Sequence, residues 1–143
     1  MGQHWKAVNL DKHEFISPNA LDAGSKLGEQ LGSRVGSALI ILCAAMPVRR
    51  GGGDFDLDSN FYGPERTDEM ALGAPVNEQY NAIAHRTIGR WAGNHIALIG
   101  EYAKDSDLPE EFKASEIYGH CSNGGWIDVT ADVLKVIEHE TSA

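Results

Sequence analysis

A row of carboxylates near the middle of the chain is the sharpest chemical pattern in the sequence. Asp54, Asp56, Asp58 and Glu65 take positions 1, 3, 5 and 12 of a twelve-residue stretch, as the carboxylates of an EF-hand calcium loop do. Position 6 is Ser59, where the sharp turn requires Gly, and the three glycines before the stretch cannot end an entering helix. We expect a solvated acidic loop without a metal, in which Asp54, Asp56 and Asp58 are candidate partner contacts. Calcium binding is the alternative.

Two arginines and three glycines directly precede this loop. Guanidinium groups and exposed backbone amides both favour phosphate, so Arg49 and Arg50 are candidate residues for a small nucleotide ligand. The stretch lacks the Gly-Lys-Ser/Thr ending of a P-loop, and the aspartates that follow would repel phosphate. A loop with two exposed arginines is the alternative. Arg90 could help to hold a nucleotide, and its neighbour Trp91 completes the set of candidate ligand- or partner-binding residues.

No residues are spaced as a complete catalytic site requires. Glu101 and Asp105 are candidate acid–base groups, but carboxylates at the exit of a strand are usually solvated. His120 and Cys121 are neighbours on an expected strand, where their side chains would point to opposite faces. The histidines and cysteines show no zinc-binding spacing, so we expect neither a metal nor another cofactor. A small hydrolase-like enzyme that uses Glu101, Asp105 or His120 remains the alternative to a non-catalytic protein.

Length and charge limit the class of protein. The 143 residues suit one domain, and an apolar content of 42% is typical of a globular chain. Twelve Lys and Arg against 21 Asp and Glu give a net charge of −9, which argues against direct binding to nucleic acid. The longest apolar run, residues 38–46, is far shorter than the roughly 20 residues that cross a bilayer. We therefore expect a cytoplasmic protein that contacts no membrane.

Residues 87–102 predict a β-hairpin. β-Branched and aromatic residues precede a Gly93-Asn94 turn, and the apolar run Ile96–Ile99 follows it. We expect this second strand to be the centre of the sheet and its best-protected strand.

Other segments complete an α+β prediction. Strands are expected at Gln3–Leu10 and Glu14–Ile16, with a second hairpin formed by Glu116–Cys121 and Trp126–Val129. The expected helices are a short turn at 25–30, a main helix from an Ser33 N-cap through Ala45, a helix at about 76–84, and a terminal helix at 131–139 capped by Thr130. In the main helix, Val35, Leu39, Ile40, Leu42 and Cys43 are expected to face the sheet. The prediction is a single α+β domain, residues 1–143, with a mainly antiparallel sheet of about five strands, two packed helices and a long irregular loop at 48–80.

Six short elements carry a resemblance to a known family: Met1–Lys6, Asn9-Leu10, Pro18, Gly24–Glu29, Arg50–Asp54 and the stretch Arg90–Ala103. Together they resemble an uncharacterised family of small proteins from tailed phages and prophages. The resemblance implies a phage protein that acts in the cytoplasm of a bacterial host. The chain departs from the family pattern at Asn94 and His95, where the family tends to have Asp-Arg, and at Glu101, where it tends to have Asp.

The functional expectation combines these observations. We expect a non-catalytic binding protein that blocks or sequesters a host component in an anti-defence or host-takeover role, with a host protein or a small nucleotide as its ligand. A homodimer is expected: Phe55, Phe61 and Tyr62 would form an exposed aromatic patch unless they fold inward or are buried in a homodimer contact.

Overall fold

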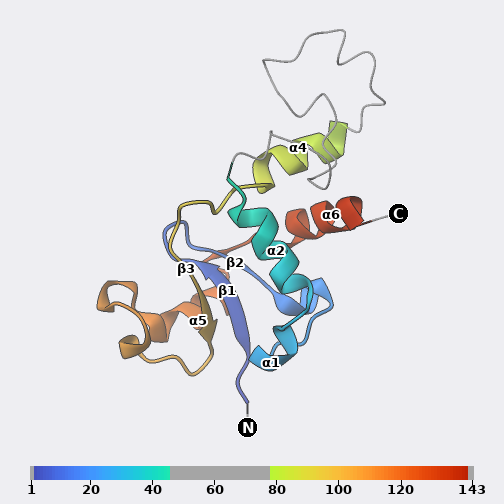
Figure 1. The fold of residues 1–143 in the computed structure, drawn as a ribbon. Helices are drawn as coiled ribbons and strands as arrows, with labels where there is room; N and C mark the ends of the chain where they lie inside the picture. Colours follow the sequence, from blue (N-terminus) through green and yellow to red (C-terminus); the bar gives the residue numbers. More distant parts are fainter. Residues whose placement is uncertain (1, 46–77, 142–143) are drawn as a thin grey trace.

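A four-stranded mixed sheet lies at the centre of the described part of the chain (Figure 1). The computed structural model describes residues 2–45 and 78–141. The strands are β1 (Trp5–Asn9), β2 (Glu14–Ile16), β3 (Ile96–Gly100) and β4 (Ile127–Asp128), in the order β3-β1-β2-β4. β1 pairs antiparallel with both β2 and β3, whereas β4 runs parallel to β2. The α+β class is confirmed; the sheet has four strands rather than about five, and it is mixed.

The β1–β2 hairpin is held by the side chain at its first corner. Asn9 Oδ1 accepts hydrogen bonds from the backbone N–H groups of Asp11 and Lys12, each at 2.9 Å. The turn ends at His13, which adopts a positive φ of 56°. Asn9 then lies opposite Glu14 in the ladder, so the turn brings these two polar side chains to the same face of the sheet.

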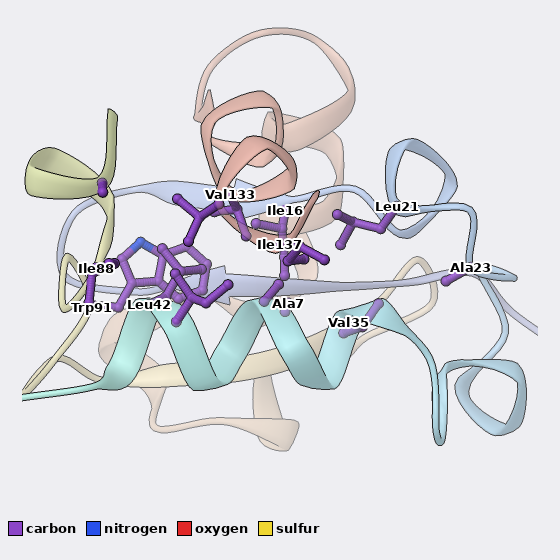
Figure 2. Close-up of a cluster of buried hydrophobic side chains, with 14 of the residues drawn as sticks. Ala7, Ile16, Leu21, Ala23, Val35, Leu42, Ile88, Trp91, Val133 and Ile137 are labelled. Carbon is purple, nitrogen blue, oxygen red and sulfur yellow. The ribbon is translucent and has the colours of Figure 1, made fainter. Parts of the chain in front are cut away.

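Three helices cover one face of the sheet: α2 (Arg34–Cys43), α4 (Glu78–Thr87) and α6 (Thr130–Thr141). Ser33 Oγ accepts a hydrogen bond from Val35 N–H, which confirms the predicted N-cap of α2. The short elements η1 (Pro18–Leu21) and α1 (Leu27–Gln30) connect β2 to α2. Figure 2 shows the core of this face, including the following residues: Ala7, Ile16, Leu21, Val35, Leu42, Ile88, Trp91, Val133 and Ile137.

The opposite face is covered by α5 (Ala114–Ser122), which follows the short helical turns η3 (Asp105–Asp107) and η4 (Glu110–Phe112). The core on this side consists of the following residues: Val8, Leu10, Phe15, Ile99, Ala114, Ile117, Cys121 and Trp126. Since neighbouring residues Ala7 and Val8 are both buried, β1 is covered on both faces. Among the described residues, no helix is long and apolar enough to span a membrane.

The predicted hairpin at residues 87–102 is wrong in its first half. α4 continues to Thr87, and a series of turns then leads to β3. Ile88 and Trp91 are buried against α2, and Trp91 N–H donates to Leu42 O at 2.8 Å. The β-branched and aromatic residues that suggested a strand therefore serve the helical core, because packing overrides local propensity.

The expected position of the second strand is also wrong. β3 lies at the edge of the sheet, where Ile96 is 39% and Leu98 40% exposed, while β1 and β2 are central. Within α2, Ile40 lies on the solvent side at 66% exposure, whereas Leu39 is partly buried against the core. The buried side of α2 is formed by Val35, Ala38, Ile41 and Leu42, which confirms the predicted positions Val35 and Leu42; Cys43 is partly buried against the core.

The second predicted hairpin is wrong in its first strand, because residues 114–122 are helical. They form α5, whose buried residues Ala114, Ile117 and Cys121 are three and four positions apart, as a helix requires. The terminal helix is confirmed, but Thr130 is not its cap: Asp128 Oδ1 accepts from Thr130 N–H at 2.9 Å. The Thr130 hydroxyl instead accepts from Ser17 N–H at 2.8 Å.

Candidate functional site

Only two of the predicted ligand- or partner-binding residues lie in the described part of the chain. Arg90 and Trp91 follow α4, whereas the carboxylates and arginines of the central loop lie outside the described residues. These are Arg49, Arg50, Asp54, Asp56, Asp58 and Glu65, and the aromatic residues Phe55, Phe61 and Tyr62 are also outside. Partner or calcium contacts of that loop therefore stay predictions.

Arg90 and Trp91 both hold the carboxylate of Glu14. Arg90 Nε donates to Glu14 Oε1 at 2.9 Å, its Nη2 donates to Oε2, and Trp91 Nε1 donates to Oε1 at 2.9 Å. Glu14 is 3% exposed and Trp91 1%. The structure thus brings these residues into one buried ionic cluster, in which the Trp91 ring belongs to the core and not to the surface.

The electrostatics of this cluster favour the ionised form of Glu14. Burial raises the pKa of its carboxyl, but the hydrogen bonds from Arg90 and Trp91 and the charges of Arg90 and Lys12 outweigh burial, so that the pKa is lowered. Hydrogen bonding to Glu14 in turn raises the pKa of Arg90. Because the carboxylate neutralises the guanidinium, Arg90 has little charge left with which to attract a phosphate group.

A groove of about 330 Å³ opens beside this cluster, between the end of α4 and the start of α6. Arg86 and Arg90 line it together with Asp128 and Asp132. Arg86 also has a carboxylate partner: its Nε and Nη2 donate to Asp132 at 2.9 and 3.0 Å. Both guanidinium groups of the groove are therefore paired, which makes it a poor site for a nucleotide.

The candidate acid–base residues do not form one site. Glu101 Oε1 accepts from His4 N–H at 3.0 Å, whereas Asp105 Oδ1 accepts from Ser115 N–H at 3.0 Å and from its hydroxyl at 2.6 Å. His120 lines a different pocket. Burial raises the pKa of the neighbouring Cys121 thiol to about 11, so that almost none of it is a reactive thiolate at neutral pH.

That pocket, about 200 Å³ in volume, lies beside α5 and was missed by reasoning from the sequence. Its floor is apolar, formed by Ile117 and Trp126, which are 1% and 8% exposed. The His13 ring stacks on Trp126, with ring centroids 4.5 Å apart and an interplanar angle of 7°. The exposed carboxylates Glu111 and Glu116 lie at its rim.

The backbone around this pocket is unusual. His13 and Lys113 both line it, and both adopt the left-handed conformation, with φ angles of 56° and 51°. Residues other than glycine rarely take positive φ, and such residues are often found at binding sites. At Lys113 this conformation turns the chain from η4 into α5.

Negative charge is concentrated next to the pocket. Five carboxylates occur between residues 105 and 116, against the single Lys113: Asp105, Asp107, Glu110, Glu111 and Glu116. All five side chains are exposed. This density was visible in the sequence, but the pocket was not, because Trp126 and His13 come from distant segments.

In comparisons with known proteins, no family model, curated protein or solved structure matches the chain. Among the described residues, no group of three His, Cys, Asp or Glu side chains is placed to hold a metal ion. The pocket beside α5 and its acidic surroundings are therefore argued from geometry alone.

Proposed function

We propose that the protein is a non-catalytic binding protein. Its acidic surface around α5, the α5 surface, binds a basic surface of a protein partner. We define the α5 surface as η3, η4, α5 and the pocket that His13 and Trp126 complete. The observation that carries the proposal is the combination of a concave aromatic pocket with two exposed carboxylates in its lining, Glu111 and Glu116, and three more in the same segment of the chain. The phage-family resemblance favours a host protein as the partner, in an anti-defence or host-takeover role.

The chemistry of the pocket favours an arginine side chain. A guanidinium group is flat, stacks on aromatic rings and donates paired hydrogen bonds to carboxylates. The stacked His13 ring offers the aromatic surface, and Glu111 and Glu116 offer the acceptors. Lysine matches the charge but not the flat shape, so an arginine-rich partner surface should bind more tightly than a lysine-rich one.

Long-range attraction supports the same partner class. A net charge of −9 attracts a basic protein surface and speeds encounter with it. The acidic segment lies on the side of the sheet opposite α6, so the paired arginines of the α4–α6 groove do not compete with it (Figure 1).

Calorimetry with an arginine-rich peptide and a lysine-rich peptide of equal length tests the proposal. We expect Glu111→Lys with Glu116→Lys to weaken the binding of the arginine peptide roughly tenfold, because exposed charge pairs contribute about 0.2–1 kcal/mol each and reversal adds repulsion. Glu138→Lys with Glu29→Lys, at exposed positions outside the α5 surface, is the control matched in charge and should change the affinity little.

Equal losses in the pocket variant and the control would mean that only net charge matters, and would contradict a specific site. A separate experiment identifies the partner: a host protein that the wild-type protein captures from lysate, and that the pocket variant does not capture, is the candidate.

A further inference from the structure

Two histidines lie among the residues that line the pocket of the α5 surface. They are His13 and His120, and both are exposed to solvent. Imidazole is the side chain that gains or loses a positive charge between about pH 5 and pH 8. The other charged residues of the lining are Glu111, Lys113 and Glu116. The charge of this pocket can therefore change with pH while the fold stays the same.

The His13 ring is held in place at the pocket. Its backbone N–H donates to Asn9 O at 3.0 Å, and its C=O accepts from Ile127 N–H at 2.9 Å. The ring stacks on Trp126 with the two centroids 4.5 Å apart. Because the backbone is bonded on both sides, the ring cannot turn away from the pocket without losing this stack. A proton on His13 therefore places a positive charge at the pocket.

The His120 ring lies close to the turn that follows α5. A Cβ atom at Gly125 would be 3.3 Å from His120 Nδ1, so the glycine leaves room for the ring. The C=O of His120 accepts from the N–H groups of Gly125 and Trp126 at 2.8 and 3.2 Å. Glu116 precedes His120 by four positions in α5, a spacing at which side chains on a helix are neighbours. A proton on His120 therefore offers Glu116 a partner within the protein itself.

Protonation of the two rings reverses the sign of the net charge of the lining. With both rings neutral, the two carboxylates and the one ammonium group of the lining leave a net charge of −1. With both rings protonated, the same residues have a net charge of +1. A lining that attracts a guanidinium group in the first state repels it in the second.

The charged groups around the lining have partners or positions of their own. Asp11 Oδ1 lies 3.2 Å from His95 Nδ1, so this carboxylate compensates a proton on His95. The ammonium group of Lys12 donates to a backbone carbonyl, and Asp128 accepts from the first N–H of α6 at 2.9 Å. Glu110 belongs to η4 outside the lining. The change of sign therefore depends on the two histidines of the pocket.

We propose that the α5 surface binds its basic partner in a pH-dependent way, and that protonation of His13 and His120 releases the partner's arginine side chain. This inference rests on the proposed function, because it concerns the same pocket and the same class of partner. In acid, the His13 imidazolium repels the guanidinium group that would stack on it. Protonated His120 also competes with that group for Glu116. Both effects weaken binding as the pH falls.

Calorimetry with the arginine-rich peptide at two pH values and one salt concentration tests the inference. Imidazole is ordinarily neutral at about pH 8 and largely protonated at about pH 5.5, whereas carboxylates are ionised at both. We expect the wild-type affinity to be about threefold to tenfold lower at the acid pH, a modest change because solvent screens exposed charges.

A double variant, His13→Asn with His120→Gln, removes both titrating rings. Asn tolerates the positive φ at position 13, and circular dichroism checks that the fold is unchanged. Since the variant also loses the stacking ring, the readout is the ratio of its affinities at the two pH values, which should approach one. His85→Gln, at an exposed position of α4 on the opposite side of the sheet, is the matched control and should keep the wild-type ratio.

Proton release gives a second readout. If protonation weakens binding, then binding must by linkage expel protons. We expect the measured heat at about pH 6.5, where imidazole is half protonated, to depend on the ionisation enthalpy of the buffer with the sign of proton release. The double variant should release fewer protons than wild type.

The outcomes separate this inference from the proposed function. Equal wild-type affinities at the two pH values, a wild-type ratio retained by the double variant, or proton uptake on binding would overturn the pH dependence and leave the binding site intact. If the peptide binds at neither pH, the proposed function is contradicted and the pH dependence falls with it.

Discussion

Glu14 carries the charge whose pairing most affects the core. Its carboxylate lies in the layer between the sheet and the helices, and among the described residues only Arg90 supplies a full positive charge to it by direct hydrogen bonds. A buried carboxylate without its partner costs far more free energy than an exposed one. The same residue type in two settings, Arg90 and Arg86, therefore offers a matched comparison.

Arg90→Ala should reduce the free energy of unfolding by about 3–5 kcal/mol, because it leaves a buried charge uncompensated. Arg86→Ala, which removes an equally well-aligned but exposed pair with Asp132, should reduce the free energy of unfolding much less, because solvent screens that pair. Urea unfolding of both variants measures the difference. Similar losses in the two variants would show that the Glu14 pair has no special contribution.

Acid should remove the stabilisation that ionised Glu14 provides. Its pKa in the folded protein is lowered, so the unfolded state binds the proton first as pH falls below the ordinary value of 4.5. The contribution is therefore complete above pH 4.5 and is lost as pH falls through the folded pKa. We expect the difference in free energy of unfolding between wild type and Glu14→Gln to shrink across this range, as followed by urea unfolding at a series of pH values. A difference that stays constant would contradict this assignment.

At the scale of the element, α6 depends on a residue that precedes it. Asp128 belongs to β4, yet its carboxylate accepts the hydrogen bond from Thr130 N–H at the first residue of α6. The Thr130 hydroxyl, also a donor to Asp128, receives Ser17 N–H and so ties the start of the helix to the end of β2. One short polar chain thus joins a strand, a helix and the loop after β2.

Asp128→Ala should lower the free energy of unfolding by about 1 kcal/mol, since it removes the oxygen that satisfies the first turn of α6. Glu138→Ala, near the exposed end of the same helix, controls for the loss of one negative charge. Thermal unfolding of the two variants decides: a melting temperature unchanged by Asp128→Ala would mean that water replaces the carboxylate without cost.

At the scale of the whole molecule, the sheet is covered unequally. Helices pack on both faces of β1 and β2, whereas β3 has a neighbouring strand on one side only in the described residues. The two cores meet through β1, where Ala7 and Val8 point to opposite sides. Opening of the molecule should therefore begin at β3 and reach β1 last.

Hydrogen exchange should follow that order. The amides of residues 6–9 in β1 face β2 or β3 in the ladders and should exchange only through global unfolding, whereas the outward amides of Ile96 and Leu98 should exchange much faster in dilute protein. Slower exchange at Ile96 than at Val8 would contradict the observed strand order.

The sequence alone determined the elements whose signals are local. Ser33 before a run with buried residues at helical spacing specified α2, the apolar positions after Thr130 specified α6, and the polar turn after Asn9 specified the β1–β2 hairpin. Each of these depends on neighbours within a few positions of the chain, which is the range over which propensity and capping act.

Only the tertiary structure decided the sheet order, the helical state of 114–122 and the environment of Arg90. Thr87, Ile88 and Trp91 have strand propensity, but burial against α2 stabilises a helix end and turns there. The parallel pairing of β4 with β2 joins residues more than 110 positions apart, and no local pattern encodes such a contact. The same reason applies to Arg90, whose partner Glu14 is 76 positions away in the sequence. It applies also to the pocket that His13 and Trp126 form, because these two residues meet only in the folded chain.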